Sequence, residues 1–214
     1  MIKSYKELTL AKWEELRNID LEQEEIDIQV QMIAVLCGDS EDNILNLPIT
    51  EYSNRARNLE FLSKAPEGHN RCPRHIRING KEYDILRNIQ DMTAGQYIDY
   101  QNYLAKDDAD KWLPYILTTF ITPKGKKYGE VDVMTVKDEI EEGLSVEDAM
   151  TIARFFFRKS QSLIVGTLTY LEWKTKKSMR KMPKEMKEKT KEALEKIQLL
   201  KDSVRNGVGY TPQS

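Results

Sequence analysis

The chain has 214 residues, of which 40% are hydrophobic and 32% are charged. This balance is typical of a folded protein and excludes a wholly disordered chain, while the length suits one large domain or two small ones. The net charge of −2 hides an asymmetry. Residues 174–205 contain 12 Lys and Arg but only five Asp and Glu. The rest of the chain contains 21 Lys and Arg and 30 Asp and Glu. An acidic body therefore precedes a basic C-terminal arm.

Two further features concern the cellular setting. Cys37 and Cys72 occur in a chain that does not open with a basic and then apolar leader, which favours a reducing intracellular setting without a disulfide framework. The longest nearly uncharged apolar stretch, 160–173, is shorter than the roughly 20 residues of a membrane-spanning helix. We therefore expect no membrane insertion, and we interpret this stretch as a buried central helix.

The first elements in chain order are two helices. Thr9 is suited to cap a short helix that begins at Leu10. Apolar residues at helical spacing predict a second helix over 22–36, which Gly38 ends. We expect the two helices to form a hairpin.

Two more helical segments are predicted after this hairpin. Ser40 opens a short one that ends before Pro48, and Thr50 can cap another that continues to Leu62. The segment 63–73 contains two prolines and a glycine among polar residues, so it is predicted to be a loop.

Residues 74–86 carry the strongest β signal of the sequence. Ile76 and Ile78 alternate with polar residues, and the pair Asn79-Gly80 follows them. Asn-Gly is typical of a type I′ turn, because both central residues of that turn need a positive φ. A β-hairpin is therefore predicted, and it must pack on the helices to be stable.

The middle of the chain is predicted to return to helices. Thr93 begins a capping-box pattern for one helix. Residues 107–121 are predicted to form a second helix, antiparallel to the first. The stretch 123–133 is predicted to be an exposed loop. Thr135 opens a second capping-box pattern, for a helix that Gly143 ends.

The longest helical pattern lies in the last third. Ser145 with Asp148 caps a helix from Val146 to about Met182, and its middle is apolar on nearly every face. Pro183 interrupts it, and a charged helix with a narrow apolar stripe follows over 184–205. The fold is thus predicted to be mainly α: a multi-helix bundle over 1–173 with one inserted β-hairpin, followed by a basic helical arm and frayed tail over 174–214.

His69, Cys72 and His75 are the best metal-ligand candidates, because they follow the spacing H-x-x-C-x-x-H and Cys37 could add a fourth zinc ligand. Structural zinc sites usually take paired ligands from two segments, whereas these three residues share one loop. Ordinary loop residues are therefore the preferred interpretation, and no metal or other cofactor is predicted.

Catalytic signatures are missing from the sequence. Both histidines lie in the 63–75 region, and no Ser or Cys has a nucleophile context. The glycine-rich motifs of nucleotide-binding proteins, G-x-x-x-x-G-K-[ST] and G-x-G-x-x-G, do not occur in the sequence. Lys124-Gly125-Lys126 is interpreted as a solvated basic turn. The acidic clusters at 22–27 and 138–142 are interpreted as solvated helix faces. The sequence thus predicts a protein that is not an enzyme.

Two groups of residues are candidate partner-binding sites. An aromatic group could anchor an interface, although packing of two adjacent helices is the alternative; it comprises Tyr97, Tyr100, Tyr103 and Trp112, together with Tyr115. A basic group in a stretch without any acid could meet phosphates or an acidic protein surface, although a solvated helix is the alternative; it comprises Lys174, Lys176, Lys177, Arg180, Lys181 and Lys184.

The order of elements also carries a resemblance. The segments concerned are 8–13 (LTLAKW), 47–52 (LPITEY), 61–62 (FL), 76–83 (IRINGKEY) and 92–99 (MTAGQYID). Together they resemble small structural or assembly proteins from the morphogenesis modules of tailed bacteriophages, including gut crAss-like phages. The likeness covers about residues 5–170, and the Lys-rich C-terminus departs from it. It carries over no catalytic residue.

The resemblance implies one of two roles. The first is a virion structural or internal cargo protein near the portal and tail, and the second is a tail assembly chaperone that is not retained. It implies that other phage structural proteins are the partners, that the chain forms a homo-oligomer or ring, and that it resides in the virion after assembly in the host cytoplasm. The basic arm favours the virion role, where DNA and acidic portal surfaces are available. A nucleic-acid-binding regulator is the alternative outside this resemblance.

Overall fold

The computed structural model describes residues 1–69, 71–106, 111–179 and 184–205, with the side chains of 184–189 excepted. The chain divides into two compact units, Met1–Phe155 and Phe156–Ser214. Their boundary falls inside one continuous helix, α8 (Val146–Met179). The mainly helical fold with an inserted β-hairpin and a long C-terminal helical arm was predicted correctly.

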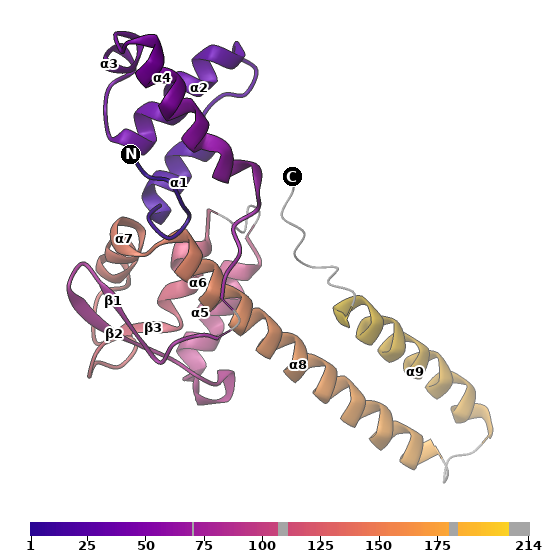
Figure 1. Cartoon of the computed structure of the whole chain (residues 1–214). Coiled ribbons are helices and arrows are strands. Elements are labelled where there is room, and N and C mark those ends of the chain that lie inside the picture. Colours follow the sequence, from indigo (N-terminus) through magenta and orange to yellow (C-terminus); the bar gives the residue numbers. More distant parts are fainter. Residues whose placement is uncertain (70, 107–110, 180–183, 206–214) are drawn as a thin grey trace. The chain divides into compact units, whose positions relative to one another are not determined.

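Four α-helices and a 3-10 helix gather at one end of the first unit (Figure 1). They are α1 (Leu10–Arg17), α2 (Glu25–Cys37), α3 (Glu41–Leu45), α4 (Ile49–Arg57) and η1 (Asn58–Ser63). The small core of this end consists of Val30, Ile33, Ala34 and Ile44, against which Tyr52 and Leu59 pack. α1 contacts α2, as predicted for these two helices.

Most helix ends in this region follow the predicted caps. The Thr9 hydroxyl accepts a hydrogen bond from the Lys12 backbone N–H, and Gly38 ends α2 in the left-handed conformation at φ 67°. The cap predicted for α4 at Thr50 was wrong, whereas the predicted helical continuation to Leu62 is present in the 3-10 form. The N-cap of α4 is Pro48, whose extended backbone leads directly into Ile49, and the helix tightens to the 3-10 form at Asn58.

A three-stranded antiparallel sheet, ordered β1-β2-β3, lies at the other end of the first unit (Figure 1). Its strands are β1 (His75–Ile78), β2 (Lys81–Ile85) and β3 (Ile121–Pro123). Asn79 and Gly80 both have positive φ, at 47° and 81°, as the predicted type I′ turn requires. β3 was not predicted, because a three-residue strand is too short to show alternation. It pairs Ile121 with Ile85.

Three helices accompany this sheet, namely α5 (Ala94–Leu104), α6 (Leu113–Thr118) and α7 (Val133–Gly143). α6 contacts β3, α7 contacts β1, and α5 contacts α6. The capping box of α5 at Thr93 is confirmed. The helix predicted over 107–121 is shorter: α6 ends at Thr118 because the chain turns into β3, and residues 107–110 lie outside the described part. The cap of α7 is Asp132 and not Thr135, whose backbone N–H donates to the Asp132 carboxylate at 3.0 Å.

The N-terminal segment connects the two ends of the first unit. The Leu10 N–H donates to the Leu144 carbonyl oxygen at 3.2 Å, and the Val146 N–H donates to that of Leu8 at 2.8 Å. These bonds flank an isolated bridge between Thr9 and Ser145, and Ser145 caps α8 as predicted. Buried residues of the first turns of α8, including Ala149 and Ile152, complete the core.

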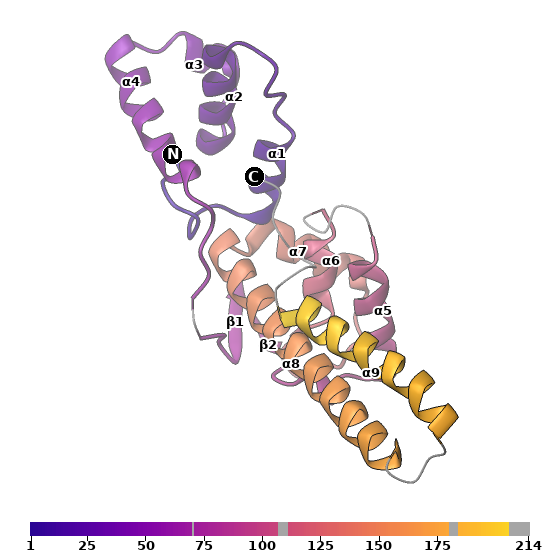
Figure 2. The same ribbon diagram turned by 90° about the vertical axis from the view of Figure 1, so that its right-hand side faces the viewer.

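In the second unit, α9 (Lys184–Arg205) runs antiparallel beside the later part of α8 (Figures 1 and 2). Gln161 Nε2 donates to the Val204 carbonyl oxygen at 3.1 Å, which joins the two helices. The predicted break at Pro183 and the predicted frayed tail fall on residues outside the described part.

The prediction of a buried central helix over 160–173 was wrong. Five large apolar residues of this stretch are 39–56% exposed, and they are Leu163, Ile164, Tyr170, Leu171 and Trp173. At about 1.5 Å per residue, 34 residues make a helix about 51 Å long, which is longer than a small domain is wide. Only its first turns therefore lie in the core of the first unit.

Candidate functional site

The hairpin of α8 and α9 has a regular line of contact between its helices. Half-buried side chains recur along α8 at steps of three and four residues, and they are Gln161, Val165, Leu168, Glu172, Thr175 and Met179. The equivalent residues of α9 are Thr190, Leu194, Ile197, Lys201 and Val204, of which Lys201 is buried. We call these two rows the seam. The spacing is that of a coiled coil, in which such rows face each other.

The seam contains a partly buried ion pair. Lys201 Nζ donates to Glu172 Oε2 at 2.7 Å, and Lys176 Nζ donates to the other carboxylate oxygen at 2.5 Å. The Lys201 side chain is only 8% exposed. The hydrogen bonds from Lys176 and Lys201 lower the pKa of Glu172 from 4.5 to about 2. A charged pair among the seam residues, most of which are uncharged and apolar, favours one register of the two helices.

The hairpin should therefore lose stability in acid. Because the folded-state pKa of Glu172 lies below its unfolded value, this contribution is fully present above about pH 4.5 and disappears as the pH falls towards 2. We expect the carboxyl carbon of Glu172 to titrate near pH 2 in NMR spectra of the full chain. The Glu172→Gln variant should show a smaller loss of thermal stability between pH 4.5 and 2 than the wild type. A Glu172 titration near pH 4.5 would contradict this expectation.

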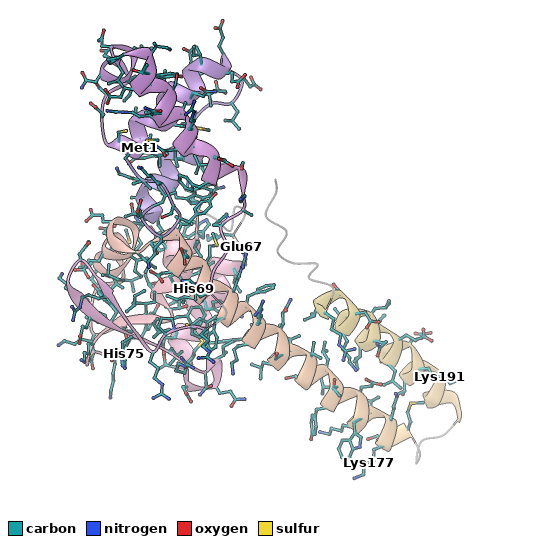
Figure 3. All side chains as sticks on the ribbon, viewed as in Figure 1. Met1, Glu67, His69, His75, Lys177 and Lys191 are labelled. Atoms are coloured by element: carbon teal, nitrogen blue, oxygen red, sulfur yellow. The ribbon has the colours of Figure 1, made fainter. Side chains whose placement is uncertain are left out.

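The basic group predicted to bind partners lies partly on this hairpin. Lys174, Lys176 and Lys177 are exposed on α8. Lys176 is paired with Glu172, and the Lys177 ammonium lies 5.0 Å from the centre of the Trp173 ring, a cation–π distance. Figure 3 labels Lys177 on α8 and Lys191 on α9. Arg180 and Lys181 lie outside the described residues, and Lys184 lies in α9 without a described side chain.

The aromatic group predicted from the sequence is divided by the fold. Tyr100 is 2% exposed and packs edge-to-face with Phe120 at 5.1 Å, so it belongs to the core. Tyr103 and Trp112 are stacked at 5.9 Å, and Tyr115 completes their cluster between α5 and α6. The helix-packing alternative accounts for these rings. Tyr97 is 46% exposed and remains at the surface.

The three metal-ligand candidates contact different partners. His69 Nε2 lies 2.5 Å from a carboxylate oxygen of Glu147, and His75 Nδ1 lies 2.7 Å from one of Asp84. Figure 3 shows these histidines in separate places. Cys72 is buried, which raises the pKa of its thiol. Within the described residues, no three His, Cys, Asp or Glu side chains gather closely enough to hold a metal ion.

The other surface features of the described residues are modest. A shallow hollow in the first unit has room for about one water molecule, and its lining includes Trp13, Arg17 and Met150. In the described part of the chain, every helix is too short or too polar to cross a lipid bilayer. The exposed apolar residues of α8 are a candidate site because they follow one another along a single helix. Other exposed apolar residues lie in the first unit, and they are Leu21, Ile26, Leu45 and Ile49. Sequence reasoning missed the α8 residues as a surface because an apolar helix pattern does not reveal what covers it.

No protein-family model matches the chain, and no curated protein or solved structure matches it either.

Proposed function

We propose that this chain is a non-enzymatic structural or internal cargo protein of a bacteriophage virion that acts through protein contacts near the portal and tail. The observation that carries the proposal is the exposed apolar surface of the α8–α9 hairpin. Among the side chains described in the second unit, only those of Phe156 and Lys201 are buried. Such a segment has almost no core of its own, and contiguous exposed apolar residues are typical of interaction sites.

Charge on the hairpin supports this role. Lys174 and Lys177 are exposed at the end of α8, next to exposed Trp173. Aromatic and aliphatic anchors supply most of the binding energy of an interface, while charges control its orientation and rate of formation. A basic end is suited to acidic protein surfaces or to DNA inside a particle. The resemblance of residues 5–170 to phage morphogenesis proteins gives the setting.

Mass spectrometry of purified particles tests the proposal. Particles of a phage that encodes the chain should contain its peptides in amounts that stay constant through gradient purification, because the hairpin would be buried in permanent contacts. Peptides that occur only in the infected-cell lysate would favour the tail assembly chaperone. The regulator would be favoured if the peptides were found in neither place and the chain showed salt-sensitive DNA binding that disappears when the basic residues of 174–181 are neutralised. These residues are Lys174, Lys176, Lys177, Arg180 and Lys181.

A further inference from the structure

The β1 strand lies at an edge of the sheet, because it pairs with β2 on one side only (Figure 1). Residues along an antiparallel strand direct their backbone N–H and C=O groups alternately to its two sides. The Arg74 carbonyl oxygen accepts a hydrogen bond from the Ile85 N–H at 2.9 Å, so Arg74 faces β2. His75 and Arg77 alternate with the residues that face β2, and they therefore direct their backbone groups away from it.

The outward N–H and C=O groups of His75 and Arg77 form what we call the open edge. In the described part of the chain, no hydrogen bond reaches these groups. α7 meets β1 where Gly143 lies against the Ile78 side chain, which is buried on the inner face of the sheet. The open edge thus offers two donors and two acceptors, and such an edge is a template for an added strand.

The surroundings of the open edge are basic. Residues 68–81 contain four Lys and Arg and two His but no Asp or Glu. Arg71 and Arg74 are exposed just before β1, and neither forms an ion pair with another described residue. Charged side chains commonly protect an edge strand from other strands. Charges of a single sign repel a basic segment but attract an acidic one.

The outer face of the sheet shows the same preference. Arg77 pairs with Glu82 on β2 at 3.2 Å, and Glu82 pairs with Lys124, which follows β3, at 2.5 Å. In the next row, His75 lies 2.7 Å from Asp84. The residue types thus alternate from basic on β1 to acidic on β2 and back to basic after β3. Opposite charges across neighbouring strands stabilise a sheet, so acidic residues on a strand beyond β1 would continue this order.

We propose that the open edge of β1 binds an extended acidic segment of a partner protein as a fourth strand. The main chain of the segment pairs with His75 and Arg77, and its acidic side chains lie beside theirs on the outer face. The residue between two acids lies on the inner face next to half-buried Ile76, and it is therefore apolar. Addition of a strand to a sheet edge is a recurring mode of peptide recognition. The proposed function does not use this surface, so the inference goes beyond that function and does not depend on it.

Two other occupants fit the open edge less well. The β1 strand of a second copy would bring Arg77 against the basic residues of the same strand, and like charges directly opposite each other destabilise a sheet. A nucleic acid would pair with the arginines, but its phosphates only accept hydrogen bonds and leave the outward carbonyl groups without a donor. An acidic peptide supplies donors, acceptors and negative charge together.

Binding of two synthetic peptides to the full chain tests the inference. Both have about nine residues and capped ends; one alternates Glu with Val, and the other alternates Lys with Val. Isothermal titration calorimetry should show that the acidic peptide binds at least about ten times more tightly, because its charges face the basic residues of the edge. In the complex, hydrogen exchange at the His75 and Arg77 amides should slow by about tenfold or more, since both become donors to the added strand.

Charge reversal at the edge tests the contribution of the basic side chains. Arg74→Glu with Arg77→Glu should raise the dissociation constant of the acidic peptide by about tenfold or more, since each cross-strand charge pair contributes up to about a factor of five. The matched control is Lys126→Glu with Lys127→Glu, which changes the net charge equally. Both lysines are exposed in the turn after β3, beyond the opposite edge of the sheet, so the control should bind as the wild type does.

A proline tests the contribution of the backbone. The His75 N–H faces away from β2, so His75→Pro removes a donor of the open edge without breaking a bond to β2, and an edge strand tolerates proline at such a position. His75→Ala is the control, because it removes the same side chain and keeps the N–H. The proline variant should bind the acidic peptide about fivefold or more weakly than the alanine variant does. Circular dichroism checks that both variants keep the fold, and amide exchange in the wild type decides if the proline variant unfolds.

Equal binding of the two peptides, or binding of neither, would overturn the inference. Equal binding of the acidic peptide by the His75→Pro and His75→Ala variants would also overturn it, because attraction between charges does not need the backbone donor. A single-stranded DNA of equal length that binds more tightly than the acidic peptide would assign the edge to nucleic acid instead. A dimer of the chain that the acidic peptide dissociates would assign it to a second copy.

Discussion

Replacing Phe120 with alanine should lower the free energy of unfolding of the full chain's first unit by about 3–5 kcal/mol. Phe120 is 1% exposed and lies between α6 and β3, where its ring meets that of Tyr100 at an angle of 68°. Removing the ring loses apolar burial, leaves a cavity and ends the edge-to-face contact. Since small domains are stable by only about 5–15 kcal/mol, the loss is a large share of the total.

Chemical denaturation followed by far-UV circular dichroism measures this effect. The midpoint should fall while the slope with denaturant stays the same, because the surface exposed on unfolding hardly changes. Tyr97→Ala is the control. The Tyr97 ring is half-exposed on α5, so its removal should lower the free energy of unfolding much less. Equal losses for the two variants would contradict the placement of Phe120 in the core.

Replacing Gly68 with alanine should destabilise the same unit by about 1–3 kcal/mol, or more if the backbone cannot shift. A Cβ atom at Gly68 would lie 2.5 Å from the Thr151 nitrogen and 2.8 Å from the Met150 carbonyl carbon. These are backbone atoms of α8 and cannot move aside as a flexible side chain could. The loop would have to leave the helix, with loss of the bond that the His69 N–H donates to Thr151 Oγ1 at 2.7 Å.

Gly95→Ala is a matched control for this substitution. A Cβ atom there meets only the Thr93 hydroxyl oxygen at 4.0 Å, and Gly95 lies in the first turn of α5. Alanine should therefore stabilise the chain by about 0.5–1 kcal/mol, because it restricts the unfolded backbone and favours helix. Thermal unfolding of the two variants should shift in opposite directions. A neutral Gly68→Ala would show that the loop does not pack this closely on α8.

Local signals in the sequence were sufficient for several elements with local causes, although the caps predicted at Thr50 and Thr135 were wrong. The hydroxyl caps at Thr9, Thr93 and Ser145 and the positive φ of Asn79-Gly80 depend on neighbouring residues, so they could be predicted. β3 could not, because its pairing with β2 joins residues about 36–40 positions apart.

The candidate site was harder to predict than the fold. An apolar pattern shows that a helix face avoids water, but not which molecule covers it, so 160–173 was placed in a bundle core. Lys201 and Glu172 look like ordinary surface charges in the sequence, yet the first is buried in the seam and bonded to the second. The seam could not be predicted because its two rows belong to two helices that lie side by side only in the folded chain (Figure 2).

The continuity of α8 across the boundary of the two units affects how the hairpin forms. Starting a new helix in water is unfavourable because several residues must be fixed before the first backbone bond forms, whereas extending an existing helix costs little. The turns of α8 that Ala149 and Ile152 fix in the core form a helix nucleus (the seed), from which the helix can extend through the residues beyond Phe155. Synthesis from the N-terminus would complete this seed first, and α9 would then have a template on which to fold.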